Sequence, residues 1–284
     1  MVLTLNRLFL ALALFVSSLV QAEILFDGYA KILAGDKHIG YFIQRYEFDP
    51  KKKEFKSTYF IQTSPEGGNI FESTIAVADD KFQPISVKYT SKVGGKMKTV
   101  DAKTKGQKFE VVTTENGQPP TKAIIPLTKD LFLSTFLQYL MLQKGYKVGQ
   151  NFTYSAISEE TGRVEKGKAF IKEEMKRNGV DGFKIINEYA NGSFESFATH
   201  RGEVLATTSP VQGISTEIVR NPAEATQGLT VPETTLKLLF GEVPAGKTNV
   251  YYKNNEPLPS TPVPQKAEPT SENKPTPAKK VKKK

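Results

Sequence analysis

Turn-forming residues divide much of the chain into short segments. Between Glu23 and Ile125 they include Asp49-Pro50, Gly94-Gly95 and Asn116-Gly117. The segments between such turns are rich in β-branched and aromatic residues, which favour strands over helices. Short strands separated by turn residues are typical of a β-meander. The pattern therefore predicts an antiparallel sheet and disfavours a chain of regularly alternating strands and helices.

Alternation within the segments indicates which side of the sheet is buried. In residues 85–90, Ile85, Val87 and Tyr89 fall on one face, and the intervening polar residues fall on the other. One face is thus expected to be dry and the other wet. The other predicted strands are 41–48, 55–62, 71–77, 99–102, 108–113, 151–157, 168–172, 183–189, 193–199, 203–209 and 215–220.

One long apolar stretch interrupts the strands. Residues 129–142 are predicted to form a helix, with Thr128 as its N-cap, Asp130 in its first turn and a stop at Gly145. The stretch is apolar almost all round, so it must be covered on most sides. A second, short helix is predicted at 232–240, ended by Gly241. The predicted fold class is α+β: a large curved antiparallel sheet, like a half-barrel, wrapped around one buried apolar helix.

The N-terminus has the composition of an export signal. Arg7 precedes an apolar run at residues 8–16, and Val20-Gln21-Ala22 has the small-residue pattern of a cleavage site. Residues 1–22 are therefore predicted to be a signal peptide cleaved after Ala22. A retained anchor is the alternative, although the apolar run is about half the ~20 residues that span a bilayer. The predicted localisation is periplasmic.

The C-terminus changes composition at about residue 253. Residues 253–284 contain seven of the 17 prolines, and eight lysines against three glutamates. Such a segment buries too little apolar area to offset the entropy of ordering it, so a disordered basic tail is expected. The tail either contacts anionic lipid or wall polymer, or is simply solvated. The β-rich domain is then expected to span residues 23–252.

The residues needed for most catalytic sites are missing or isolated. The chain has no cysteine, which excludes thiol catalysis, disulfides and thiolate metal sites. Its two histidines, His38 and His200, both lie in expected turns. No nucleophile elbow or phosphate-binding glycine loop is present. We therefore expect no catalytic residues, no cofactor and no metal.

Two further charge patterns have ordinary explanations. The carboxylate pairs Asp79/Asp80, Glu159/Glu160 and Glu173/Glu174 fall in charge-rich turns or segment ends, where solvated carboxylates are expected. The lysines of residues 88–108 either bind polyanions or discourage pairing at a sheet edge. Much of the net charge of +9 lies in the tail, and the chain is predicted to be exported. Nucleic acid is therefore not an expected partner.

The order of several motifs resembles a known kind of domain. These motifs are Ile39-Gly40-Tyr41, Phe82-Gln83-Pro84-Ile85-Ser86, Gly94-Gly95, Lys147-Val148-Gly149-Gln150 and Gly202-Glu203-Val204-Leu205. Over roughly residues 28–226 the chain resembles the β-rich exported domain that precedes the catalytic core in bacterial transglutaminase-like secreted proteins. The resemblance implies a stand-alone accessory module, because no cysteine-containing core follows. The module also looks like the half-barrel of periplasmic lipoprotein carriers, which can shelter an acyl chain.

These observations lead to one main functional hypothesis and two alternatives. The main hypothesis is a non-enzymatic periplasmic binding or accessory protein. It would hold a lipid-like or peptide ligand, or an envelope protein partner, on the concave face of the sheet. The groove residues are predicted to be Phe132, Phe136, Tyr139 and Leu140. The first alternative is an envelope scaffold or adaptor that binds a protein through a strand edge or turns, without a ligand cavity. The second is a wall-polymer hydrolase that uses carboxylates.

Overall fold

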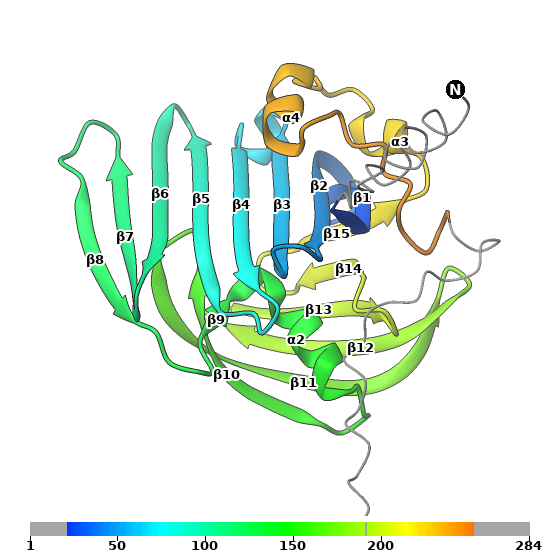
Figure 1. The fold of residues 1–284 in the computed structure, drawn as a ribbon. Coiled ribbons are helices and arrows are strands. Elements are labelled where there is room, and N and C mark those ends of the chain that lie inside the picture. The colour runs from blue at the N-terminus through cyan, green and yellow to red at the C-terminus, as the bar shows by residue number, and fades with distance from the viewer. Residues whose placement is uncertain (1–21, 191, 253–284) are drawn as a thin grey trace, which may run out of the picture.

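A single unclosed sheet dominates the computed structural model, which describes residues 22–190 and 192–252 (Figure 1). Its strands follow the order β8-β7-β6-β5-β4-β3-β2-β1-β15-β14-β13-β12-β11-β10-β9, so β8 and β9 are the two edges. Neighbouring strands pair antiparallel except β9 and β10, which are parallel and make the sheet mixed. The predicted signal peptide and basic tail lie outside the described residues, apart from Ala22.

The strands and helices have the following bounds. The strands are β1 (Glu23–Ala34), β2 (Lys37–Asp49), β3 (Glu54–Thr63), β4 (Phe71–Asp79), β5 (Pro84–Val93), β6 (Lys96–Lys105), β7 (Lys108–Glu115), β8 (Thr121–Pro126), β9 (Phe132–Leu133), β10 (Asn151–Ser158), β11 (Arg163–Arg177), β12 (Val180–Tyr189), β13 (Gly192–Thr199), β14 (Val204–Ser209) and β15 (Ile214–Val219). The helices are the 3-10 turns η1 (Pro65–Gly67) and η2 (Ser134–Phe136), and the α-helices α2 (Leu137–Lys144), α3 (Pro222–Thr226) and α4 (Glu233–Phe240).

The sheet curves so that its first half, β1–β8, faces its second half, β9–β15, with α2 between them (Figure 1). The largest apolar core lies in this interior. The first half contributes residues such as Phe82 and Phe109, the second half contributes Ile171 and Ile185, and Phe136 lies among them. Burial of these side chains on the inner face is what the strand alternation predicts.

The helix in the middle of the chain is shorter than predicted and begins later. Instead of a helix over 129–142, Phe132 and Leu133 form the edge strand β9, which pairs with Ala156 and Ile157 of β10. The strand pairing buries both side chains and satisfies backbone groups that a helix would have satisfied internally. Helix α2 then runs over Leu137–Lys144.

Helix α2 is also less enclosed than its composition suggested. Leu137, Tyr139 and Met141 are buried, whereas Gln143 and Lys144 are exposed. Although α2 is rich in apolar residues, the rest of the protein does not surround it on every side. The sheet supplies most of the core, and α2 fills only part of the interior.

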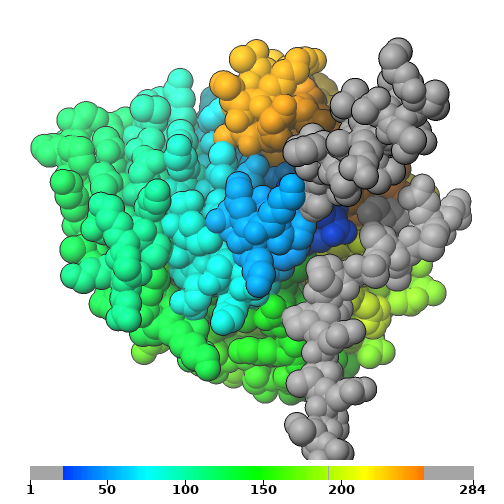
Figure 2. Space-filling view, in the orientation of Figure 1, coloured from blue at the N-terminus to red at the C-terminus, as the bar shows by residue number. Residues whose placement is uncertain are grey.

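The outer face of the first half is covered by the C-terminal helices. Tyr41 and Phe60 point outward from β2 and β3 and are buried against Leu236 and Phe240 of α4. The predicted helix at 232–240 is confirmed as α4, and Gly241 ends it with a φ of 82°. Figure 2 shows this yellow and orange segment packed over the blue and cyan strands. The outer faces of β1–β3 are therefore covered by protein.

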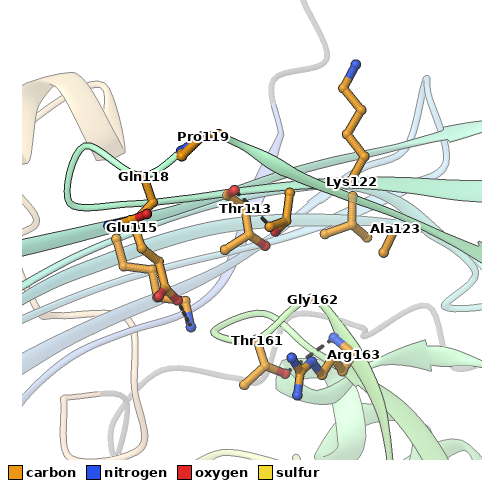
Figure 3. A pocket seen from close by; sticks show the side chains of 12 residues that line it. Thr113, Glu115, Gln118, Pro119, Lys122, Ala123, Thr161, Gly162 and Arg163 are labelled. Carbon is orange, nitrogen blue, oxygen red and sulfur yellow. Dashed lines mark hydrogen bonds and ion pairs between the residues drawn. The ribbon is translucent and has the colours of Figure 1, made fainter.

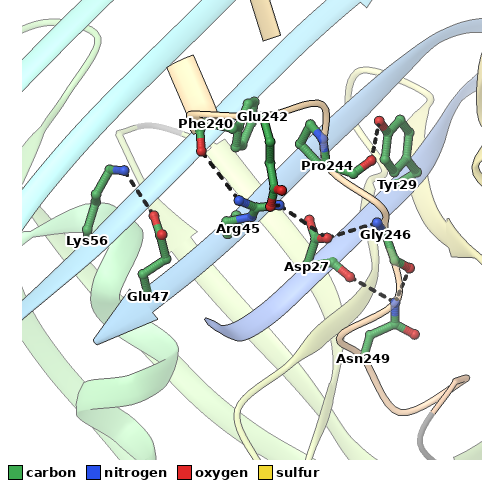
Figure 4. A network of polar contacts seen from close by, with 10 residues as sticks. All are labelled: Asp27, Tyr29, Arg45, Glu47, Lys56, Phe240, Glu242, Pro244, Gly246 and Asn249. Carbon is green, nitrogen blue, oxygen red and sulfur yellow. Dashed lines mark hydrogen bonds and ion pairs between the residues drawn. The ribbon is translucent and has the colours of Figure 1, made fainter. Parts of the chain in front are cut away.

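A buried polar network fastens the segment after α4 to β1 and β2 (Figure 4). Arg45 lies 3.5 Å from Asp27 and 3.1 Å from Glu242. Asp27 also accepts a hydrogen bond from the Gly246 amide at 2.8 Å. Asn249 donates to the carbonyl oxygens of Asp27 and Gly246 at 2.9 Å each. The network joins residues from the two ends of the described chain.

Candidate functional site

A cleft of about 400 Å³ lies in the interior, between the inner faces of the two halves of the sheet. We call it the central cleft. Its walls come from β1–β4, from β12–β15, from the start of α2 and from the turn between β10 and β11. The lining residues are Ala30, Ile32, Phe42, Gln44, Tyr46, Tyr59, Ile61, Glu72, Ser134, Thr135, Leu137, Gln138, Glu159, Glu160, Asn187, Ser196, Val204, Leu205, Thr207, Thr216 and Ile218.

The apolar residues of this lining face the cleft because side chains alternate between the two faces of a strand. On β1, Ala30 and Ile32 face the cleft, while the intervening strand positions face the other side. Register brings Ala30 opposite Ile218 on β15, whose side chain also lines the cleft. On β2, Phe42 is half-buried, so the apolar wall remains in contact with solvent. The cleft thus has an apolar strip along β1, β2 and β15, where the two halves of the sheet meet.

Glu72 forms the polar part of the wall on the first half of the sheet. It is half-buried on β4, and its carboxylate accepts a hydrogen bond from the Tyr59 hydroxyl at 2.8 Å. Burial raises the pKa of Glu72 to about 7, with the nearby charge of Glu160 adding to the rise and the hydroxyls of Tyr59 and Tyr89 opposing it. Near neutral pH this carboxyl is therefore divided between its charged and neutral forms.

Glu159 provides a second carboxyl, from the β10–β11 turn. It accepts hydrogen bonds from Ser134 Oγ at 2.5 Å and from the Thr135 amide at 3.1 Å. Burial raises its pKa to about 7, although these hydrogen bonds oppose the rise. The carboxylate accepts from a hydroxyl and a backbone amide just before α2. It thereby stabilises the residues before α2, where a helix was predicted and none forms.

Glu160 follows in the same turn and lies on the side of the cleft that reaches solvent. Glu160 is exposed, yet desolvation by the surrounding protein raises the pKa of its carboxyl. The positive charge of Lys98 opposes this rise. The expectation that Glu159 and Glu160 would both be solvated turn residues is therefore wrong for Glu159, which is 5% exposed. The turn is packed into the interior rather than projecting from it.

Hydrogen bonds across the cleft hold its walls in place. The Tyr46 hydroxyl donates to the Thr135 carbonyl oxygen at 2.8 Å and accepts from the Gln44 side chain at 2.7 Å. Ser57 Oγ lies 2.9 Å from Thr135 Oγ1. These contacts tie β2 and β3 to η2, so the first half of the sheet and the start of α2 form one preorganised wall.

A second cavity, of about 800 Å³, lies next to the β10–β11 turn (Figure 3). This turn separates it from the central cleft. Its walls are β7, β8, the turn residues Thr161 and Gly162, and Arg163 at the start of β11. Lys98 also lines it, in an ion pair with Glu115 at 3.3 Å. The β10–β11 turn therefore presents Glu159 and Glu160 to one cavity and its last residues to the other. We call this second space the edge cavity.

The four residues predicted to line a groove do not line the central cleft. Phe136 and Tyr139 are buried in the core, where both rings contact Tyr46, with centroid distances of 6.3 and 4.9 Å. Phe132 and Leu140 line a different cavity, of about 880 Å³, together with Gln83 and Lys144. Their neighbours Ser134, Thr135, Leu137 and Gln138 reach the central cleft instead, from the 3-10 turn η2 and the first turn of α2.

Several cleft residues had a signal in the sequence and others had none. Tyr59 and Ile61 alternate along a predicted strand, so a common face for them was foreseeable. Glu159 lies in Glu159-Glu160-Thr161-Gly162, which has the composition of a solvated turn, and its burial has no local signal. His38 is the second residue of β2 and is half-buried, so the expectation that it lies in a turn is wrong, while His200 is an exposed turn residue as expected.

The described residues contain no metal-binding group and no membrane-spanning helix. No set of three or more His, Cys, Asp or Glu side chains in residues 22–190 and 192–252 is arranged to hold a metal ion. In the same part of the chain, no helix combines the length and apolarity that crossing a membrane requires.

Comparisons with known proteins leave the family open. No family model and no curated protein matches the chain. Among solved structures, the chain is similar to a β-barrel-like protein with a domain of unknown function, DUF1849, from Brucella abortus. That neighbour has 12% identity and a TM-score of 0.47, and the match covers 69% of this chain and 98% of that chain. A DUF1089 family protein from Pseudomonas aeruginosa has 9% identity and a TM-score of 0.37, covering 61% of this chain and 90% of that chain. Likenesses this low have no bearing on function, and the resemblance to the transglutaminase-associated domain stays a prediction.

Proposed function

We propose that this protein is a non-enzymatic, exported binding protein whose central cleft holds a lipid-like, amphiphilic ligand. The apolar body of the ligand would lie along Ala30, Ile32 and Ile218. Its head group would donate hydrogen bonds to Glu72 and Glu160. The observation that carries the proposal is the composition of the cleft: an apolar strip beside carboxyls that form no ion pair anywhere in the described chain.

Size and chemistry support this occupant. A volume of about 400 Å³ falls within the range of ~300–1,000 Å³ of small-molecule sites. Such sites combine apolar walls with a few polar groups that fix orientation. An ionised carboxylate accepts hydrogen bonds and cannot donate them. Such groups therefore favour a head group with N–H or O–H donors, above all an ammonium group.

The proposal extends to the finer features of fold and location. A strongly curved sheet around a partly enclosed helix is the architecture expected of a half-barrel carrier. A periplasmic location follows from the predicted signal peptide. In this interpretation the chain is an accessory module that resembles the β-rich exported domain of bacterial transglutaminase-like proteins.

The first test is native mass spectrometry of residues 23–284 purified from their own periplasm, followed by denaturing analysis of whatever is bound. A stoichiometric small molecule of lipid mass supports the proposal. A protein without a bound small molecule, or one bound to a second polypeptide, contradicts it and favours the adaptor.

A second test uses dodecylamine as a probe for the cleft. Thr216 lines the cleft on β15, whereas its neighbour Ser215 faces the opposite side of the strand. Thr216→Phe fills the cleft and should weaken dodecylamine binding at least tenfold in isothermal titration calorimetry. The matched variant Ser215→Phe should bind as the parent does. Equal affinities for the two variants would place the binding site outside the central cleft.

The head group can be tested with the same probe. Glu72→Gln should weaken dodecylamine binding, because it removes the charge that attracts the ammonium group. Dodecanol, which has no charge, should lose much less affinity from this substitution. An equal loss for both ligands would contradict the assigned role of Glu72.

A further inference from the structure

Among residues 22–190 and 192–252, no strand pairs with the outer edge of β8. β8 is the last strand in the sheet order, and every residue of Thr121–Pro126 pairs only with β7. Four consecutive residues, Thr121 to Ile124, are exposed, and Ile124 is 60% exposed. The free amide and carbonyl groups of such an edge form a template for another strand.

The two faces of β8 offer different surroundings to an added strand. Thr121 and Ala123 are small and face the edge cavity, which extends beneath the free edge to Arg163 (Figure 3). Lys122 also belongs to the lining of the edge cavity, but its side chain extends away from Thr161 and Arg163 in the same view, as alternation requires. A strand placed beside β8 would therefore insert alternate side chains over the edge cavity and display the others beside Lys122.

The positive charges around β8 indicate which kind of partner fits the edge. The two β7 carboxylates are already in ion pairs: Glu110 with Lys105 at 2.6 Å and Glu115 with Lys98 at 3.3 Å. Within the described residues, Lys108 on β7 and Lys122 on β8 have no ion-pair partner. Arg163, at the far wall of the edge cavity, has none either. The free edge is thus bordered by uncompensated positive charge.

We propose that β8 is a docking edge for an extended, acidic segment of a partner protein, which adds to the sheet as its next strand. The segment would be about six residues long to match Thr121–Pro126. Acidic side chains would lie beside Lys122, and small or apolar ones would enter the edge cavity.

Other occupants fit the edge less well. A second copy would bring the same lysines together, and like charges across paired strands are destabilising. The chain's own residues 253–284 carry eight lysines and seven prolines, and proline lacks the N–H that a ladder needs. Acidic extended peptide is therefore the occupant that both charge and backbone favour.

The test uses an acetylated, amidated hexapeptide of alternating glutamate and valine, titrated calorimetrically into residues 23–284. Saturable binding is expected, with an affinity that falls as salt is added. Two N-methylated versions, one modified on the glutamate amides and one on the valine amides, test the strand pairing. Only one set of amides faces β8, so one version should lose binding and the other should keep it.

Variants then locate the site. Lys122→Glu should weaken binding at least fivefold. The same charge change at Lys51, exposed in the β2–β3 turn, should change binding less than twofold. Thr216→Phe should leave peptide binding unchanged, so failure of the cleft proposal and failure of this one can be told apart.

Four outcomes would overturn the proposal: no peptide binding, equal binding of both methylated peptides, an equal effect of Lys51→Glu and Lys122→Glu, or a concentration-dependent dimer that Ile124→Asp abolishes. The last would assign the edge to a second copy of the chain.

Discussion

Arg45 is the residue at which both ends of the described chain meet. It is buried, and it pairs with Asp27 of β1 and with Glu242 after α4. Arg45→Met should lower the free energy of unfolding by about 3–5 kcal/mol, because Asp27 would remain buried without its counter-charge. Urea denaturation followed by circular dichroism measures the change.

The matched control lies on the neighbouring strand pair, β2 and β3. Lys56→Met breaks the ion pair with Glu47, whose partners are partly exposed, and should cost less than about 1 kcal/mol. If the two variants lost equal stability, the network in Figure 4 would have no special role in the fold.

Glu159 makes stability depend on pH. Its pKa is raised from 4.5 to about 7 in the folded protein, so the folded state holds the proton more tightly than the unfolded chain does. Its contribution is therefore greatest below about pH 4.5 and is lost as pH rises toward 7, by about 3 kcal/mol in all. Glu159→Gln should flatten this part of the curve in urea titrations from pH 4.5 to 8.

Two comparisons make that test specific. The same substitution at Glu173, exposed on β11, should leave the curve as it is in the parent. Glu72 should still give the Glu159→Gln variant a smaller slope of the same sign. A curve that kept its full slope in this variant would show that Glu159 titrates as an ordinary carboxyl.

At the scale of elements, the β10–β11 turn is packed against β7. A methyl group added at Gly162 would lie 2.4 Å from Val111 Cγ1, and the residue has a φ of +62°. Gly106 has nearly the same φ, +59°, but open space around it. Gly106→Ala should cost about 1 kcal/mol from backbone strain. Gly162→Ala should cost a further 1–3 kcal/mol from overpacking.

Thermal denaturation of the two glycine variants measures this difference directly. Their backbone strain is matched, so the excess in Gly162→Ala reports the contact between the two halves of the sheet. Equal losses would mean that the turn moves away from β7 without cost, and that the edge cavity is not a fixed feature.

At the scale of the whole molecule, the segment after α4 stabilises the fold by bonding to β1. A chain of residues 23–252 keeps every contact of the described structure and should unfold at the same urea concentration as residues 23–284. A chain of residues 23–240 loses Gly246 and Asn249 from the network. It should lose about 3 kcal/mol, because the hydrogen bond from Gly246 to the Asp27 carboxylate contributes about 1.5–3 kcal/mol and the neutral one from Asn249 to the Asp27 carbonyl about 0.5–1.5 kcal/mol. Equal midpoints for all three chains would contradict this role.

Local chemistry was sufficient to predict most strands and their faces. Each predicted strand coincides with one of β2–β7 and β10–β15, although 203–209 begins one residue before β14 and 215–220 ends one residue after β15. Alternation and turn residues act over a few neighbouring positions, which is why they suffice for these strands. Gly94-Gly95 and Asn116-Gly117 have the positive φ angles that such hairpin turns require. β8 was missed because its residues show no regular alternation, and all of them except Ile125 are exposed.

The amino-acid sequence by itself determined the β-rich fold class, the α4 stop at Gly241 and the absence of thiol chemistry, since these depend on residue type and near neighbours. Tertiary structure decided where α2 begins, because Phe132 and Leu133 pair with β10 and Glu159 binds the backbone of Thr135. It also decided the site: the central cleft joins β1–β4 to β12–β15, which are far apart in the chain and meet only through the register of the folded sheet. Burial of Glu159 and the free edge of β8 follow from that same long-range arrangement, which no local pattern encodes.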